Sequence, residues 1–158
     1  MRSLLARDWK LDVDTYIPGA TEPTWTPVKG LTSFERSSDD NTEEDGDFDD
    51  EEGYGSSVVT GRTWQIEAEG RRKRTDDTVF TPDPGQEKIL KVAQIVGFNA
   101  NIWVCWCRRD GAPDAYEGTR TVTDYTEGGE TTDLEPFSFT LLGQGSPTEI
   151  ANPVTEAP

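Results

Sequence analysis

The chain has 158 residues, a formal net charge of −16 and an isoelectric point near 4.2, and 32% of its residues are hydrophobic. Its length suits one domain with a modest core, and because only 32% of the residues are hydrophobic, much of the chain must lie at a surface, in loops or in an interface. The charge argues against holding nucleic acid by counterion release and against acidic membranes as partners, but not against a protein that must avoid sticking to nucleic acid. The absence of histidine excludes His-based acid–base catalysis and most zinc sites.

Few features of the sequence indicate a cellular location or a role for the cysteines. Residues 1–10 carry only a three-residue apolar run before Arg7, and no eighteen apolar residues run together, so neither a signal peptide nor a membrane span is predicted. Cys105 and Cys107 lie two apart in an apolar run, a spacing poorly suited to a disulfide and insufficient for zinc. We interpret both as small buried hydrophobes of a chain made in a reducing cytosol.

The N-terminal third reads as two strands. Apolar and polar residues alternate from Trp9 to Ile17, which predicts a first strand that Pro18–Gly19 ends. Trp25 then lies in a short connection between two prolines. A second strand is expected over Pro27–Arg36, where Gly30 upsets the alternation and suggests a bulge.

The most distinctive stretch is Ser38–Ser56, SDDNTEEDGDFDDEEGYGS. So many like charges repel one another, and the apolar surface is too small to offset the ordering entropy, so we expect a long mobile loop at the tip of a hairpin. This loop is either a solvated loop of no consequence or, as we prefer, an arm that becomes ordered on meeting a neighbouring subunit. Its candidate contact residues are Asp39, Asp40, Glu43, Glu44, Asp45, Asp47, Phe48, Asp49, Asp50, Glu51, Glu52 and Tyr54.

A half-buried strand is predicted from Ser57 to Gly70, because Trp64, Ile66 and Ala68 alternate with polar residues that include Glu67 and Glu69. The basic tetrad Arg71, Arg72, Lys73 and Arg74 follows. Such a tetrad is usually a solvated turn, and a nucleic-acid or nuclear-signal role fits poorly with the overall charge. It lies at the opposite end of this strand from the acidic loop, so it is also a candidate basic counterpart for the loop of a neighbouring copy.

One helix is expected over Pro84–Val96. Asp83 suits the N-cap, Pro84 the first helical position, and Gln86 completes a capping-box spacing. Gly97 supplies the C-terminal stop. The apolar stripe that should face the core consists of Ile89, Val92, Ala93 and Val96.

The remaining chain predicts three more strands: Asn101–Arg108, buried on both faces, then Tyr116–Asp124 and Pro136–Leu142. Trp64, Trp103 and Trp106 belong to apolar patterns and are expected in the core. We therefore predict a mainly β protein, an antiparallel β-sandwich or partly open barrel with one flanking α-helix and a long acidic loop. Residues 1–147 form one domain and residues 148–158 a flexible C-terminal tail.

The sequence gives little support for a metal-binding or catalytic site. The stretch from Asn41 to Glu52 approximates an EF-hand calcium loop, but its first and third positions deviate and its flanks are predicted strands. Acidic residues are so numerous that no carboxylate pair is singled out for glycosidase chemistry. No glycine-rich phosphate loop follows a strand. The chain is therefore not expected to be an enzyme or to carry a cofactor.

The order of these segments resembles the major tail tube proteins of long, non-contractile-tailed bacteriophages. The resemblance rests on WTPVKGLTSFERSSDDN, GYGSSVVTGRTWQIEAEGRRKR, the helix, YEGTRTVTDYT and DLEPFSFTLLGQGSP, and covers about Trp9 to Pro147. It implies a β-sandwich with one helix, six copies joined into a ring, and rings stacked into a hollow tube that conducts DNA. Ser38–Ser56 corresponds to the loop that contacts other subunits and rings.

The resemblance also implies partners and a location: further copies of the chain, a tape-measure protein, a tail terminator and distal tail or baseplate proteins, in a virion tail assembled in the bacterial cytoplasm. DNA would pass without specific binding, because carboxylates repel phosphates whereas Lys and Arg would retard them. Candidates for the lumen lining, or for an ordinary solvated face, are Glu67, Glu69, Glu117 and Asp124. The rival interpretation is an acidic DNA mimic that inhibits a nucleic-acid-binding enzyme.

Overall fold

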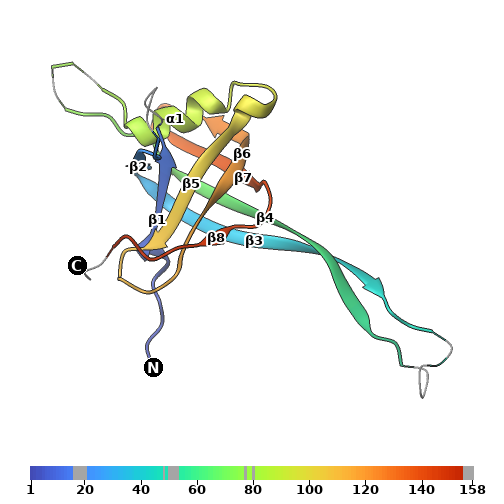
Figure 1. The fold of residues 1–158 in the computed structure, drawn as a ribbon. Coiled ribbons are helices and arrows are strands. Elements are labelled where there is room, and N and C mark those ends of the chain that lie inside the picture. Colours follow the sequence, from blue (N-terminus) through green and yellow to red (C-terminus); the bar gives the residue numbers. More distant parts are fainter. Residues whose placement is uncertain (16–20, 48, 50–53, 77, 80, 155–158) are drawn as a thin grey trace.

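A computed structural model describes residues 1–15, 21–47, 49, 54–76, 78–79 and 81–154. Within this part of the chain, eight strands form one antiparallel sheet in the order β2-β1-β5-β6-β7-β4-β3, and β8 also pairs with β6 (Figure 1). The strands are β1 (Trp9–Asp14), β2 (Trp25–Pro27), β3 (Leu31–Glu44), β4 (Ser57–Arg71), β5 (Asn101–Arg108), β6 (Ala115–Glu127), β7 (Pro136–Gly143) and β8 (Thr148–Glu149). The helix α1 (Pro84–Val92) and the 3-10 turns η1 (Ala6–Asp8) and η3 (Phe98–Ala100) complete the elements.

The predicted mainly β architecture with one flanking helix is confirmed. The sheet is open, with β2 and β3 at its two edges. Along β4 the buried residues Ile66, Ala68 and Gly70 alternate with the exposed residues Glu67 and Glu69, as the period of two predicts. One face of the sheet is therefore the core face and the other is polar.

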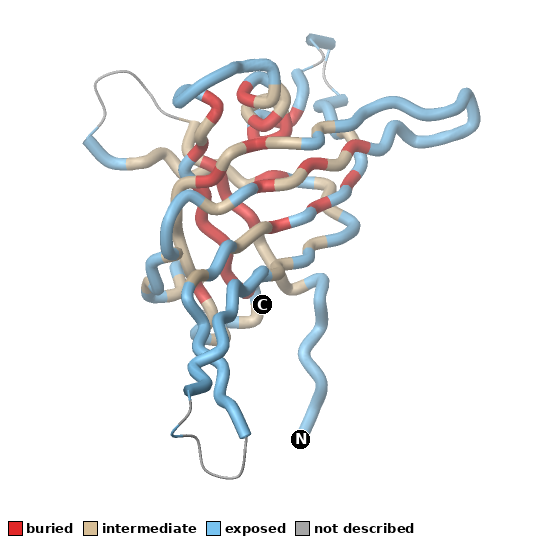
Figure 2. Tube along the Cα trace, turned by 90° about the vertical axis from the view of Figure 1, so that its right-hand side faces the viewer, coloured by how far each residue is buried: buried red, intermediate tan, exposed pale blue. Residues whose placement is uncertain are grey.

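The core lies inside the curved sheet, where Trp9 of β1 stacks on Phe34 of β3, and α1 covers one end of it (Figure 2). It consists of Leu11, Val13, Val28, Ile66, Ala68, Ile89, Val92, Ile102, Val104, Trp106, Val122, Phe137, Phe139 and Leu141. Gly70 allows close packing here, because a Cβ at this position would lie 2.7 Å from the carbonyl oxygen of Gly30 and 2.9 Å from the Phe137 ring. Gly30 itself has φ +79° and precedes a register shift between Leu31 and Ser33, which agrees with the predicted bulge.

The helix begins as predicted and ends earlier. Asp83 is the N-cap and accepts from the Gln86 backbone N–H at 3.2 Å, with Pro84 in the first turn. The Gln86 side chain does not close a capping box; it is buried and bonds Lys73 N–H and the carbonyl oxygens of Lys29 and Arg71. No described helix has the length and apolar character needed to cross a membrane.

Three sequence predictions at this end of the helix and in the C-terminal segment need correction. The stripe extends only to Ala93, because the helix ends at Val92 and Val96 is 95% exposed. Gly97, with φ +88°, therefore turns the chain into η3 instead of stopping the helix. Part of the predicted tail is structured: Thr148 pairs with Glu117, and the Asn152 amide donates to carbonyl oxygens of β5 and of the following loop.

The first strand is also shorter than predicted, since β1 ends at Asp14, while Tyr16 and Ile17 lie outside the described residues. Trp25 is not in a connection but in β2, where it pairs with Asp14. β1 therefore pairs with β2 on one side and with β5 on the other, which places β1 inside the sheet.

Candidate assembly surfaces

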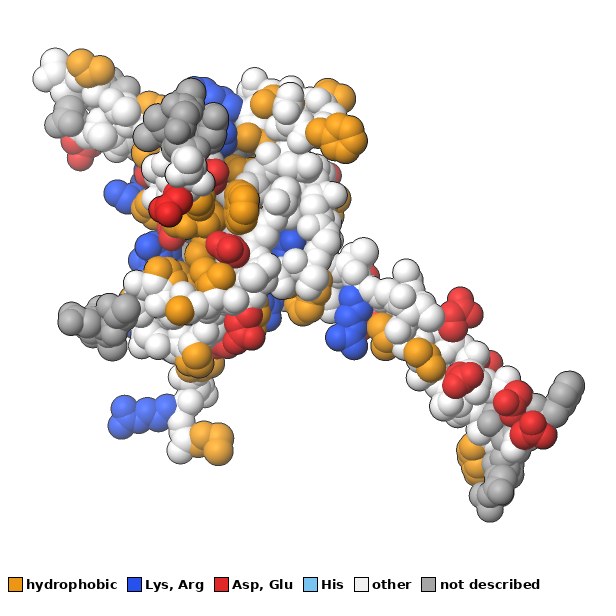
Figure 3. Space-filling view, in the orientation of Figure 1, with side chains coloured by type: hydrophobic (Ala, Val, Ile, Leu, Met, Phe, Trp, Pro, Cys, Tyr) orange, Lys and Arg blue, Asp and Glu red, His pale blue; other side chains and the backbone are white. Residues whose placement is uncertain are grey.

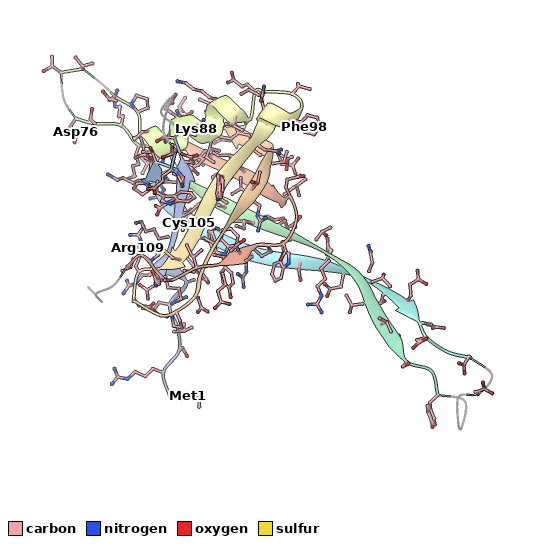
Figure 4. All side chains as sticks on the ribbon, in the orientation of Figure 1. Met1, Asp76, Lys88, Phe98, Cys105 and Arg109 are labelled. Carbon is pink, nitrogen blue, oxygen red and sulfur yellow. The ribbon has the colours of Figure 1, made fainter. Side chains whose placement is uncertain are left out.

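The outer half of the β3–β4 hairpin projects from the body (Figure 1). Because β7 pairs with β4 only from Gln65 to Arg71, the outer part of β4 is hydrogen-bonded to β3 alone. We call residues 38–64 the arm. Its described side chains are exposed or half-buried, and Figure 4 shows those of its outer part extending away from the body on both sides.

The arm is acidic and carries some apolar surface. Acidic side chains gather along its outer part (Figure 3). Asp40 forms an exposed ion pair with Arg62 at 3.5 Å, a contact of small energetic value. Val58, Val59 and Tyr54 are 50%, 43% and 79% exposed. A segment with exposed apolar side chains and no support from its own chain is suited to contact with another molecule.

Residues 38–44 belong to a strand, whereas the sequence predicted a loop there. Asp39, Asp40, Glu43 and Glu44 belong to β3, and Asp45 begins the connection with an N–H bond to the Ser56 carbonyl oxygen at 2.7 Å. The reason is the partner strand: Thr42 and Glu43 face Val59 and Val58, whose β-branched side chains favour extended pairing. Of the remaining candidates, Asp47, Asp49 and Tyr54 are exposed. Phe48, Asp50, Glu51 and Glu52 lie outside the described residues.

The polar face of the sheet holds a second acidic group. Glu67 faces Glu35 on β3 and Thr140 on β7, while Glu69 faces Ser33 and Ser138. These side chains line one shallow hollow together with Asp124. The structure thus brings together Glu67, Glu69 and Asp124 of the predicted lumen candidates.

Asp124 reaches this hollow because of a bulge in β6. Register with β7 shifts between Thr123 and Thr126, so two residues of β6 oppose one of β7, and Asp124 has φ +52°. Aspartate tolerates this left-handed conformation better than most residues because its short side chain is polar. The bulge therefore turns a carboxylate toward the same hollow as the β4 glutamates.

Glu117 does not join this group. It is half-buried near the other end of β6, where it pairs with Cys105 on one side and Thr148 on the other. Sequence reasoning missed Glu35, which lines the hollow directly opposite Glu67. The alternation of Phe34 with its polar neighbours could have identified it, because it places Glu35 on the polar face.

The basic tetrad lies at the end of β4 farthest from the arm, as predicted (Figure 1). Arg71 and Lys73 are exposed. Arg72 is instead held inside the subunit, where its guanidinium contacts Glu87 at 2.8 Å and donates to the Tyr125 hydroxyl at 3.1 Å. Arg72 therefore cannot meet another subunit without breaking these internal contacts, whereas the side chains of Arg71 and Lys73 are accessible.

The structure confirms the expected burial of some of the tryptophans and cysteines and contradicts it for Trp103. Trp106 is fully buried and Trp64 is half-buried, but Trp103 is 45% exposed, which contradicts its expected core position. Trp103 lies on the polar side of β5, because its neighbours Ile102 and Val104 face the core. The two cysteines are buried and unpaired, as expected.

Metal binding finds no support in the described residues, where no cluster of three or more potential ligands occurs. The calcium-like stretch 41–52 includes residues 48 and 50–52, which lie outside that part of the chain.

The buried carboxyl group of Asp12 on β1 has one described partner, Lys10 Nζ at 3.4 Å from one oxygen, and its other oxygen has no hydrogen-bond partner among the described residues. Burial raises the pKa of Asp12, and Lys10 opposes that effect.

The same fold occurs in chains of solved tail and virion structures. The chain resembles a subunit in the tail of an empty gene transfer agent particle refined with C6 helical symmetry (TM-score 0.66, 14% identity, 94% of this chain and 100% of that chain covered). It also resembles a chain of a native gene transfer agent virion, with a TM-score of 0.64 and 15% identity over 94% of this chain and 100% of that chain. For the SPP1 tail tube the TM-score is 0.67 and the identity 13%, over 95% of this chain and 81% of that chain. No protein-family model and no curated protein matches the sequence.

Proposed function

We propose that this chain is the structural subunit of a tail tube in a phage or phage-like particle. Copies form rings, six to a ring, and rings stack into a tube through which DNA leaves the particle. The observation that carries the proposal is the likeness to tail and tail-tube chains over 94–95% of the sequence, including all of the gene transfer agent chain. An open sheet and an exposed arm suit such a role, because both leave backbone or side chains for neighbours to contact.

The polar face provides a lining for the channel. Glu35, Glu67, Glu69 and Asp124 place four carboxylates around one hollow, and the Ser and Thr side chains between them add no positive charge. Phosphates moving past such a surface make no ion pairs, so DNA is not retained. The role is mechanical and non-enzymatic, in a virion tail assembled in the host cytoplasm. The other partners are a tape-measure protein inside the tube, a tail terminator and distal tail or baseplate proteins at its ends.

Electron microscopy of the concentrated purified protein tests this proposal. Rings or tubes with a central channel are the expected result. A protein that stays monomeric or dimeric at every concentration, and that inhibits a DNA-binding enzyme in proportion to its amount, would instead identify a DNA mimic. Addition of a calcium chelator serves as a control, since tube formation should be unaffected by it.

A further inference from the structure

Two arginines at the base of the arm pair with no carboxylate in the part of the chain that the structure describes. Arg36 on β3 and Arg120 on β6 both point to the core side of the sheet. Arg120 is 1% exposed, its Nη1 donates to the Thr119 carbonyl oxygen at 3.2 Å, and its Nε and Nη2 have no hydrogen-bond partner. Arg36 is half-buried. Neither guanidinium forms an ion pair with any carboxylate in the described part of the chain.

Aromatic rings hold these two cations in place. The Arg36 guanidinium lies 5.1 Å from the Trp64 ring centroid and 4.8 Å from that of Tyr116. Arg120 lies 4.9 Å from the Trp106 ring, which stacks on Tyr116 at 5.9 Å. Burial, and then the charge of Arg36, lower the pKa of Arg120, which agrees with two neighbouring cations and no anion. Cations in such surroundings are costly unless an anion joins them.

We propose that a carboxylate from the arm of a second copy of this chain binds Arg36, with Arg120 as a fixed positive charge behind it. The inference rests on the proposed self-assembly and names one of its contacts. Arg36 makes the direct contact because its side chain is partly accessible. Arg120 acts through the field that a buried, uncompensated charge creates in a low-dielectric surrounding.

Charge and geometry identify the occupant. The arm carries Asp39, Asp40, Glu43, Glu44 and Asp45 in the described residues, all exposed. No carboxylate of the same arm pairs with Arg36 in the described residues: Asp40 pairs with Arg62 instead, and the hairpin runs outward to Asp45, nine residues or about 30 Å away at 3.3 Å per residue. A nucleic acid is a poor occupant, because its phosphates would approach past these acidic residues and against a net charge of −16.

Two complementary variants test the contact. The first is Arg36→Glu with the natural arm. The second keeps Arg36 and reverses the arm by Asp39→Lys, Asp40→Lys, Glu43→Lys and Glu44→Lys. At low salt each variant alone should associate about tenfold or more slowly than wild type, because like charges then meet at the contact. A 1:1 mixture should recover association, since each arm meets a base of opposite charge. Sedimentation velocity measures association whatever the shape of the product.

Controls separate folding from docking. Lys91→Glu makes the same charge change at an exposed position of α1 and should associate like wild type. Circular dichroism checks each fold; if Arg36→Glu unfolds, Arg36→Gln replaces it and should still slow association. Wild-type rates in these Arg36 variants, or a folded mixture that fails to recover, would overturn the inference. So would binding of short duplex DNA that Arg36→Gln abolishes.

The outcomes for this contact and for the proposed function are distinguishable. Tubes that form equally fast with and without Arg36 keep the tail-tube function and overturn the contact. Oligomers that depend on Arg36 but never form tubes in electron micrographs keep the contact and contradict the function. A wild-type protein that does not associate at all contradicts both.

Discussion

Asp12 is buried in a site that offers one partner for its two carboxyl oxygens. It is 5% exposed on β1, faces Cys105, and contacts Lys10 through one oxygen only. Because folding raises the pKa of Asp12 above 3.8, the folded protein binds this proton more tightly than the unfolded chain does. Protonation of Asp12 therefore adds stability as the pH falls from the folded-state pKa toward 3.8, and the ionised form costs stability above that range.

We expect Asp12→Asn to raise the free energy of unfolding by about 1 kcal/mol at pH 7, because it removes a buried charge with an unsatisfied oxygen. The gain should shrink as the pH is lowered, because the natural residue then takes up its proton, and its raised pKa makes it do so at a higher pH in the folded protein than in the unfolded chain. Urea unfolding of both proteins across this range measures the difference. A difference that stays constant from pH 7 to pH 4 would show that ionisation of Asp12 is not its cause.

Glu35 and Glu67 face each other directly across β3 and β4, an arrangement that opposes folding. Glu67→Gln should raise the unfolding free energy by about 0.5 kcal/mol at low salt and by less at high salt, because only the repulsion is removed. Gln65 can still donate to the remaining side-chain oxygen, as it does to Glu67 at 3.2 Å. Thermal unfolding at two salt concentrations measures the effect. The control Glu130→Gln, in an exposed loop, should change little.

At the scale of elements, the arm should be dispensable for folding and required for assembly. Asp39 and Thr63 are a cross-strand pair at the base of the arm, so residues 40–62 can be replaced by Asn-Gly, a two-residue hairpin turn. The core is untouched, because none of its residues lies in the arm. We expect a folded monomer with a melting temperature near that of wild type, which forms no rings or tubes. Normal tubes from this variant would make the arm a solvated hairpin without function.

The sequence predicted the elements whose local signals agree with their surroundings. Asp83 and Pro84 mark the helix start, and the alternation of Ile66 and Ala68 with acidic residues marks the two faces of β4. Prediction from the sequence failed where a partner segment distant in the chain determines the local structure. Residues 39–44 are strand because Val58 and Val59 pair with them, although Asp and Glu are depleted in strands. The Asp124 bulge and the internal contacts of Arg72 likewise depend on tertiary contacts without a local signal.

At the scale of the molecule, charge is separated along β4, with the acidic arm at one end and Arg71 and Lys73 at the other. A contact between unlike ends of two copies is heterologous and propagates without closing, as stacked rings require. We expect Arg71→Glu with Lys73→Glu to slow tube elongation at low salt while rings still form. Arg72 is left unchanged because its reversal would break the Glu87 contact.

Light scattering follows elongation of this variant, and electron microscopy counts rings. A matched double reversal at Arg2 and Arg7, both exposed near the N-terminus, controls for the change in net charge. Added salt should slow the wild type toward the variant by screening over about 10 Å at 0.1 M. Elongation of the variant at the wild-type rate in low salt would leave the basic tetrad a solvated turn.

In the proposed tube, the polar face of the sheet is expected to face the channel. A cryo-electron-microscopy map of the assembled protein tests it most directly. We predict stacked rings with Glu35, Glu67, Glu69 and Asp124 on the channel wall and each arm in contact with a neighbouring copy. A map that places these carboxylates on the outside of the tube, or an assembly without a channel, would contradict the account.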